Sequence, residues 1–288
     1  MPEMPEIQAH AERLTEQFSG RVLTGFTPFN FTALKTAVPP PSDAFGSPLV
    51  EVGRRGKYLL LRFEPVTFVV HLMQGGRLVP DEKRSAKPRG GQARFVFEPV
   101  ERDDGSIDET ALLLTEQGKE RRAGVWCVPT DQLSTTAPLD KLGPEAATIG
   151  DTELAELFAA NSMRVHGCLR DQRMIAGIGR RLANAVCHRA RVSPFANTRK
   201  LGADGAATVA AAIRSCVDEG LTEERARADM SSSKDRPSAM HSRTGDPCPD
   251  CSDTVRAVVY SGYTVNYCPT CQTGGKVLAD NTTSKFLK

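Results

Sequence analysis

Two cysteine pairs near the end of the chain restrict its fold more than any other feature. Cys248 and Cys251 lie in CPDC, Cys268 and Cys271 lie in CPTC, and 16 residues separate the pairs. This spacing is typical of a structural zinc site with four thiolate ligands. The intervening segment alternates in hydrophobicity and carries Ser-Gly near its middle, which predicts a β-hairpin. We expect one zinc ion to stabilise residues 241–288, with disulfides or free thiols as the alternatives.

The other cysteines are scattered singly through apolar or helical surroundings. They are Cys127, Cys168, Cys187 and Cys216. Isolated cysteines of a cytosolic protein are most often buried thiols. The sequence has no apolar run as long as a membrane span, and its first residues lack the apolar core of a signal peptide. We therefore expect a cytoplasmic, nucleoid-associated protein that does not enter a membrane.

The hydrophobic patterns predict an α+β protein of several domains. Apolar residues make up 40% of the 288 residues, which is enough for two packed cores. Residues 5–20 have helical spacing, whereas residues 21–128 form short β-rich runs separated by Gly, Pro and Asp. Helical patterns return at 151–162, 180–192 and 205–221.

These patterns suggest the following division of the chain. The predicted parts are a β-rich sandwich or barrel with one helix at 1–130, a linker at 131–150, a helical domain at 151–240 and the cysteine module at 241–288. The linker is rich in Pro and Thr, which is typical of a connection between domains.

Positive charge is concentrated in the helical region. Between residues 161 and 200 there are nine basic residues and a single acid, Asp171, although the whole chain carries only +2. This cluster indicates contact with a polyanion, and a solvated helix face is the alternative. Gly177 and Gly179 come just before the helical pattern that begins with Arg180 and Arg181. Backbone N–H groups at such a turn can approach a phosphate, or the turn can simply pack two helices together.

The amino terminus reads MPEMPEI, with the dipeptide Pro-Glu repeated. Removal of Met1 would leave the nitrogen of Pro2 as a free secondary amine. Such an amine is partly unprotonated at neutral pH and can attack an electrophilic carbon. Glu3 could then move protons beside it. Read alone, the same pattern is also met by chance, because many chains begin with Met-Pro.

Four features in this order resemble the formamidopyrimidine-DNA glycosylase/endonuclease VIII family. They are MPEMPEI, GRRGKYLLL about fifty residues later, AGIG in a basic helical region, and the C-terminal four-cysteine hairpin. The resemblance also covers LGPE at 142–145 and HSRTGDPCPDC before the cysteine module, and so spans essentially the whole chain. It implies a β-sandwich domain, a helix-two-turns-helix domain and a zinc-finger hairpin, with damaged DNA bound in the cleft between domains.

The resemblance also implies roles for particular residues. Pro2 is similar to the nucleophile that attacks C1′ of the damaged nucleotide, and Glu3 to the acid and base that opens the sugar. Glu6 resembles the second carboxylate of the family pattern, and Lys57 the lysine that binds phosphate beside the lesion. The base would leave the stack for a pocket, and β- and δ-elimination would then nick the strand.

DNA-contacting positions follow from the same resemblance. Met73 or Gln74, in HLMQGGRL, matches the residue that fills the gap left by the flipped base, and Arg122 occupies the position of a second gap-filling residue. Gly179, Arg180 and Arg181 would contact the DNA backbone. We expect a monomer, and we expect oxidised pyrimidines rather than purines because the loop at Met73 departs from the form usual in purine enzymes.

The chain departs from the family pattern at several DNA-contacting positions. Arg180 replaces an asparagine, Ala185 replaces a glutamate, and Tyr263 stands where an arginine of the hairpin usually grips DNA. Ala123 replaces the phenylalanine that wedges opposite the lesion. These changes suggest a divergent subfamily in which the missing wedge matters less on single-stranded DNA. A catalytically weak or lyase-only DNA-binding relative is the main alternative, and a zinc-ribbon module for protein interaction is a third.

Overall fold

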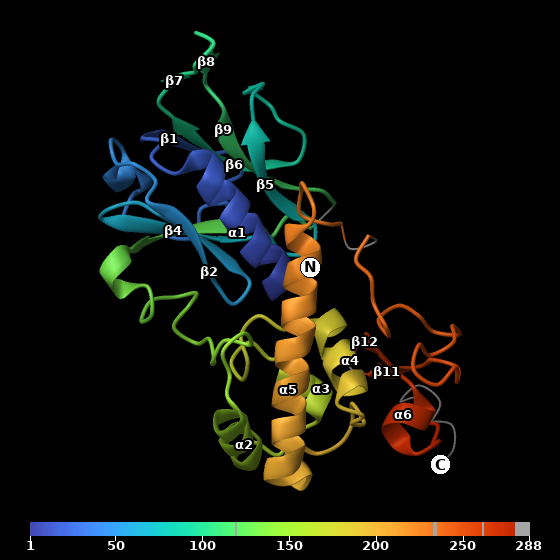
Figure 1. The fold of residues 1–288 in the computed structure, drawn as a ribbon. Helices are drawn as coiled ribbons and strands as arrows, with labels where there is room; N and C mark the ends of the chain where they lie inside the picture. Colours follow the sequence, from blue (N-terminus) through green and yellow to red (C-terminus); the bar gives the residue numbers. More distant parts are fainter. Residues whose placement is uncertain (119, 233–234, 261, 280–288) are drawn as a thin grey trace. The chain divides into compact units, whose positions relative to one another are not determined.

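A computed structural model describes residues 1–118, 120–232, 235–260 and 262–279 (Figure 1). Backbone contacts divide the chain into two units. The first unit comprises Met1–Pro2 and Glu6–Lys141, and the second comprises Glu3–Pro5 and Leu142–Lys288. The division after Lys141 falls inside the range 131–150 that we propose as the linker.

Helix α1 (Met4–Phe18), from Glu6 onward, and a series of strands form the first unit. The strands are β1 (Leu23–Pro28), β2 (Glu51–Arg55), β3 (Tyr58–Arg62), β4 (Val66–His71), β5 (Gly76–Asp81), β6 (Gly91–Phe97), β7 (Val100–Glu101), β8 (Ile107–Asp108), β9 (Ala111–Glu116) and β10 (Gly124–Pro129). In the described residues they form two four-stranded sheets, ordered β1-β6-β9-β5 and β10-β4-β3-β2, and a small β7-β8 ribbon. Short 3-10 turns lie at Pro41–Ala44 and Thr130–Gln132.

Aromatic side chains join the two sheets of the first unit. Phe68 of β4 stacks on Phe26 of β1 with ring centroids 5.6 Å apart, and it meets Phe95 of β6 edge-on at 5.2 Å. Phe18 at the end of α1 lies 5.4 Å from Phe97 of β6. Because burial of one Phe side chain stabilises by about 1.5–3 kcal/mol, this cluster holds the sandwich together.

The second unit is mainly helical. Its elements are α2 (Asp151–Ala160), α3 (Val165–Arg170), α4 (Arg180–Arg189), α5 (Thr198–Arg225), β11 (Arg256–Tyr260), β12 (Tyr263–Tyr267) and α6 (Pro269–Thr273). A core that includes Leu154, Phe158, Leu182 and Ile213 packs α2, α4 and α5 together. None of the helices in the described part of the chain is long and apolar enough to cross a membrane.

Helix α5 and the β11-β12 hairpin were both predicted from sequence patterns. Helix α5 begins seven residues before the predicted range 205–221, because Asn197 caps it by accepting a hydrogen bond from the Arg199 N–H. Gly202 permits this extension, since its φ of +66° makes a kink that a side chain would resist. The predicted β-hairpin is confirmed, with Arg256 opposite Tyr267 and Tyr260 opposite Tyr263. Ser261 in its turn lies outside the described residues.

Candidate active site and metal centre

Strand register brings three predicted site residues to one end of the second sheet. His71, the last residue of β4, pairs with Tyr58 of β3 and with Gly124 of β10. Lys57 comes just before Tyr58, Met73 is two residues beyond His71, and Arg122 is two residues before Gly124. We call this end of the sheet, with its connecting loops, the strand-end site.

The amino terminus of the chain lies near the strand-end site. Lys57 is buried, and its charge and that of the amino terminus both act on the imidazole of His71. Burial is the largest cause, followed by Lys57 and the terminus, and together they lower the pKa of His71 to about 4. His71 is therefore neutral near pH 7. Pro2, the residue after Met1, is itself buried.

His71 fixes the loop that carries the predicted gap-filling residues. Its Nδ1 atom accepts a hydrogen bond from the Met73 N–H at 3.1 Å, and Met73 has a φ of +52°. The Gly76 N–H closes the loop on the carbonyl oxygen of Leu72, and a Cβ on Gly76 would lie 2.2 Å from that oxygen. Gln74 is exposed at the tip, whereas Met73 is half-buried. Of the two predicted wedges, Gln74 therefore projects further.

The segment around Arg122 offers a cation and no aromatic ring. The Arg122 side chain is exposed and pairs with Glu120 at 2.9 Å. Ala123 is buried, and its N–H donates to the Glu116 carboxylate at 2.6 Å. Because this methyl group points into the protein, Ala123 has no surface on which a base could stack.

The second unit holds Glu3 at the start of a helix. The Glu3 carboxylate accepts hydrogen bonds from the Arg181 and Leu182 N–H groups, both at 3.0 Å. These amides are among the orphan donors at the first turn of α4, where the helix dipole favours a negative charge. Glu3 is 4% exposed, so its two oxygens are fixed in position. Glu6, in the first turn of α1, is fully buried.

The glycine turn before α4 makes room for this carboxylate. A Cβ on Gly179 would lie 2.3 Å from an oxygen of Glu3, and a Cβ on Gly177 would lie 2.8 Å from the Cβ of Met4. The Gly177 carbonyl accepts a hydrogen bond from the Met4 N–H at 2.9 Å. The N–H groups of Arg181 and Leu182 therefore bind a carboxylate in this structure, and the phosphate contact expected at this turn stays a prediction.

The predicted cations of α4 differ in exposure. Arg180, the first residue of α4, is exposed, whereas Arg181 is half-buried. The side chain of Arg180 can thus approach a phosphate from solvent even though the neighbouring amides are occupied. Sequence reasoning gave no hint that Glu3 binds this helix, because 178 residues separate the partners.

Tyr263, at the start of β12, packs onto α3. Its ring stacks on His166 at a centroid distance of 5.8 Å, and the Arg170 guanidinium lies 3.6 Å from the ring centroid. His166 is 2% exposed, and burial is the first cause that lowers its pKa to about 4, followed by the charge of Arg170. Tyr263 therefore anchors the hairpin through a ring contact and a cation–π contact.

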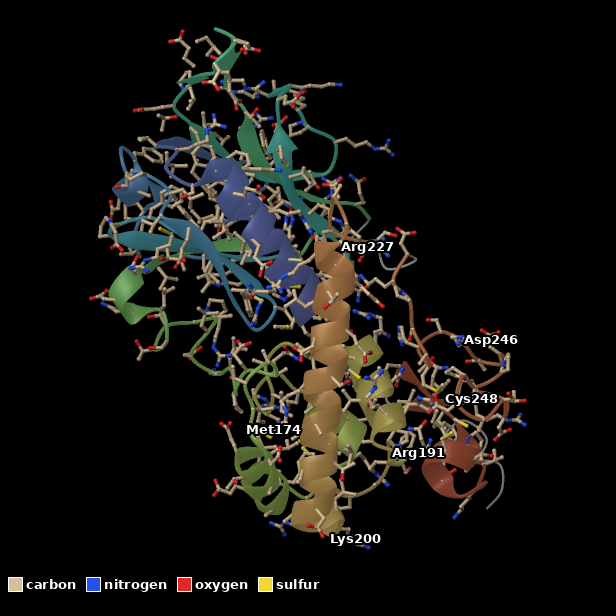
Figure 2. All side chains as sticks on the ribbon, in the orientation of Figure 1. Met174, Arg191, Lys200, Arg227, Asp246 and Cys248 are labelled. Atoms are coloured by element: carbon tan, nitrogen blue, oxygen red, sulfur yellow. The ribbon has the colours of Figure 1, made fainter. Side chains whose placement is uncertain are left out.

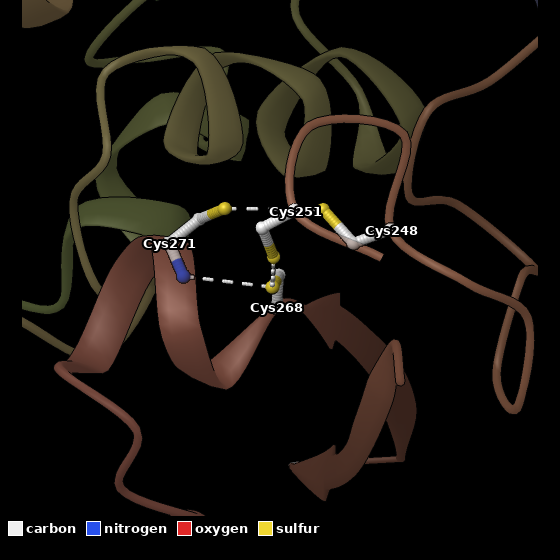
Figure 3. A group of neighbouring side chains, drawn as sticks. All are labelled: Cys248, Cys251, Cys268 and Cys271. Carbon is white, nitrogen blue, oxygen red and sulfur yellow. Dashed lines mark hydrogen bonds between the residues drawn. The ribbon is translucent and has the colours of Figure 1, made fainter. Parts of the chain in front are cut away.

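The four paired cysteines converge on one point (Figure 3). Their sulfur atoms all lie within 4.8 Å of one another, with Cys251 and Cys268 3.4 Å apart and Cys248 and Cys271 3.9 Å apart. Four thiolates bound about 2.3 Å from one zinc ion would lie about 3.8 Å from one another. The residues therefore fit a tetrahedral metal site, which Cys248, Cys251, Cys268 and Cys271 would hold.

Contacts from α4 hold this cysteine module in place. His188 Nε2 lies 3.3 Å from the Cys248 sulfur, and Gln272 donates to the Val192 carbonyl at 3.0 Å. Arg191 lies just beyond α4, and its guanidinium is 3.8 Å from the Asp250 carboxylate (Figure 2). Groups that hydrogen-bond to a metal ligand orient it, and His188 is placed to do this for Cys248.

The isolated cysteines are all buried, as predicted. Burial raises the pKa of Cys127 and Cys168 to about 12 and that of Cys216 to about 11, and it also raises the pKa of Cys187. Because the thiolate is the reactive form, these side chains are inert near pH 7.

The chain is similar in sequence to known DNA glycosylases and a related protein. Residues 1–117 match the formamidopyrimidine-DNA glycosylase N-terminal domain. An uncharacterized formamidopyrimidine-DNA glycosylase-like protein of Mycobacterium tuberculosis is 39% identical over 149 residues, which cover 51% of this chain and 94% of the relative. The chain belongs to the formamidopyrimidine-DNA glycosylase/endonuclease VIII family. Another family protein, a formamidopyrimidine-DNA glycosylase of Chloroflexus aurantiacus, is 28% identical over 94% of this chain and 98% of its own length.

The family fold extends through both units. The structure of a Lactococcus lactis formamidopyrimidine-DNA glycosylase, non-covalently bound to DNA that contains an AP site, matches with a TM-score of 0.80. It is 17% identical and covers 94% of this chain and 99% of its own. The α+β architecture with a four-cysteine β-hairpin, predicted from sequence, is thus confirmed as that of the family.

Proposed function

We propose that this protein is a base-excision-repair DNA glycosylase and AP lyase that uses the amine of Pro2. It would remove oxidised bases and then nick the strand by β- and δ-elimination. The observation that supports this most is the position of the amino terminus, whose charge acts on His71 together with that of Lys57. A nucleophilic amine beside a lysine would meet a sugar whose phosphate Lys57 binds.

The chemistry requires Met1 to be removed, because the nitrogen of Pro2 is otherwise an amide. The free amine attacks C1′, and the electrons of the glycosidic bond leave with the base, which takes up a proton. The attached nitrogen then loses its proton, the C1′–O4′ bond breaks with O4′ taking up a proton, and an iminium ion forms at C1′. Because the amine is secondary, this iminium carries no N–H and cannot be neutralised by deprotonation. Loss of a proton from C2′ expels the 3′ phosphate, and a second elimination expels the 5′ phosphate.

Other residues of the chain would assist these steps. The amides of α4 hold the Glu3 carboxylate next in sequence to Pro2, where it could accept and return protons. Glu6 would support the site from within α1. The proposed DNA contacts are Gln74, Met73, Arg122, Gly179, Arg180, Arg181 and Tyr263. The metal of the cysteine module would be zinc, which supplies folding energy and takes no part in the reaction.

Borohydride trapping with abasic-site DNA tests the nucleophile. We expect a covalent adduct, and mass spectrometry of its peptides should place the DNA on Pro2 of chains that lack Met1. Pro5→Ala is the matched control. Pro5, like Pro2, begins a Pro-Glu pair, but it lies within α1 and its nitrogen is not the amino terminus. An adduct on Lys57, or none from protein verified to begin at Pro2, would contradict the proposal.

A lyase-only or catalytically weak relative is the second candidate. Two observations favour it: Ala123 is buried, and Tyr263 packs on α3. Both positions depart from the family pattern for gripping duplex DNA. Parallel assays on oxidised pyrimidines, oxidised purines and abasic sites separate the candidates. Activity on abasic sites alone would support the second candidate, and we expect base removal with pyrimidines first.

A further inference from the structure

Phe31 is the most exposed large apolar side chain in the part of the chain that the structure describes. It is 98% exposed, and the next is Val38 at 81%. Burying a Phe side chain would stabilise the protein, so its complete exposure forgoes that stabilisation. Single exposed apolar residues are common, so its exposure needs support from the surrounding structure before it indicates a function.

The turn that carries Phe31 is fixed by hydrogen bonds on both sides of it. The Asn30 side-chain oxygen accepts from the Thr32 N–H and from the Thr32 hydroxyl, both at 3.2 Å. The Ala33 N–H donates to the Asn30 carbonyl at 2.9 Å, and Ala33 is fully buried. An Asx turn of this kind holds its second residue in a defined orientation. Phe31 is thus displayed by an ordered turn.

This turn lies against the strand-end site. The Val125 N–H donates to the Ala33 carbonyl at 2.8 Å, and the Lys35 N–H donates to the Val125 carbonyl at 2.8 Å. A Cβ on Gly124 would lie 2.2 Å from Cε of Lys35, so the Lys35 stem crosses the strand directly after Ala123. The turn therefore adjoins the segment that carries Arg122.

Charge and shape at this point suit a nucleic-acid strand. Lys35, Arg121 and Arg122 are exposed on the two adjoining segments, with Arg122 paired to Glu120, and cations of this kind attract phosphates. Ala123 is buried and cannot stack. An aromatic ring among cations is the usual platform on which an unpaired base stacks.

We propose that Phe31 is a stacking platform for an unpaired base of DNA bound at the strand-end site. The inference rests on the proposed function, because it needs the chain to bind DNA there. Phe31 supplies the aromatic surface that Ala123 lacks, from a different loop. It acts through binding, so it affects affinity before it affects any chemical step.

The test compares Phe31→Ala with two matched variants. Phe31→Tyr keeps an aromatic ring, and Val38→Ala removes the other highly exposed apolar side chain of the same loop. The probes are a labelled single-stranded oligonucleotide and a duplex, each with a stable abasic analogue. We expect Phe31→Ala to weaken binding of the single strand about tenfold, within the range measured for base stacking, whereas the other variants bind like wild type.

The outcomes separate this inference from the proposed function. If wild type binds neither probe, the proposed function and the inference both fail. If wild type binds and Phe31→Ala binds equally well, only the inference is overturned. Sedimentation of both proteins without DNA adds a further check: self-association of wild type that Phe31→Ala abolishes, with DNA binding unchanged, would assign Phe31 to a protein interface and overturn the inference.

Discussion

The two units prepare their site residues by different physical means. In the first unit, strand register sets Lys57, His71 and the Met73 loop side by side, and the charges that act on His71 are positive. In the second unit, a glycine turn opens the start of α4, and the carboxylate of Glu3 fills it. One site thus consists of cations and exposed loops, whereas the other is an anion held at the start of a helix.

Metal removal should separate the two units most strongly. Structural zinc contributes about 10–16 kcal/mol to the folding of zinc-finger peptides at neutral pH, and the first unit has no share in this site. We expect Cys268→Ser to lose zinc and to unfold residues 241–279. Zinc analysis and hydrogen exchange measure the second unit, while fluorescence of Trp126, the sole tryptophan of the chain, reports the first.

The Trp126 signal serves as the internal control for that experiment. Its unfolding midpoint should stay at the wild-type value, since β10 belongs to the first unit. A Cys268→Ser protein that retains one zinc ion and full protection in β11 and β12 would contradict the assignment of the ligands.

Acid should destabilise both units through one buried histidine each. The pKa values of His71 and His166 are lowered from 6.5 to about 4, so the folded state favours the neutral forms. This stability is complete above pH 6.5 and is lost as the pH falls towards 4, because the unfolded chain takes up the proton first. For His71 the loss is about 3 kcal/mol.

Urea unfolding of the first unit, followed by Trp126, measures that loss. We expect the difference in the free energy of unfolding between wild type and His71→Gln to shrink between pH 7 and pH 4. A difference that is constant with pH would show that the His71 pKa is not lowered, and His166→Gln serves as the control that should leave the Trp126 curve unchanged.

The smallest effects are expected from Gly76→Ala and Gly179→Ala. The first should lower stability, and the second should lower adduct formation. Gly76→Ala sets a Cβ against a backbone oxygen that cannot retreat, so we expect the first unit to lose about 1–3 kcal/mol. Gly179→Ala instead meets the end of the Glu3 side chain, which can swing away and release α4. It should leave the Trp126 midpoint unchanged while reducing adduct formation with abasic DNA at least tenfold.

A third glycine provides the control for both changes. A Cβ on Gly53 would have its nearest neighbour at 3.9 Å, so Gly53→Ala should preserve stability and adduct formation. If Gly76→Ala lost adduct formation and Gly179→Ala did not, the reaction would depend more on the strand-end loop than on the position of Glu3.

Local patterns predicted much of the fold. The spacing of the cysteines fixed the hairpin and its metal site, because both depend on residues within a short segment. Helical and β-rich patterns located the two classes of domain. The start of α5 was missed because it depends on the Asn197 cap and on Gly202, and neither belongs to the hydrophobic pattern.

The site was only partly predictable. Lys57, Met73 and Arg122 were identified through the family pattern, and register explains why they lie at one edge. His71 was not predicted as a site residue, although it lies in the segment HLMQGGRL. Nothing in the sequence indicates that its imidazole accepts a hydrogen bond from the Met73 N–H. The exposure of Phe31 could not be predicted, because no sequence pattern distinguishes it from the Phe residues that are buried.

The sequence by itself determined the family, the order of the elements, the residues for a metal and the Pro-Glu terminus. Only the tertiary structure decided that Glu3 takes the amides of α4, that Tyr263 packs onto α3 and that Phe31 stands in solvent. The physical reason is the range of the interactions. Periodicity and ligand spacing act along neighbouring residues, whereas a carboxylate on a distant helix, or a ring against another helix, exists only after the chain has packed.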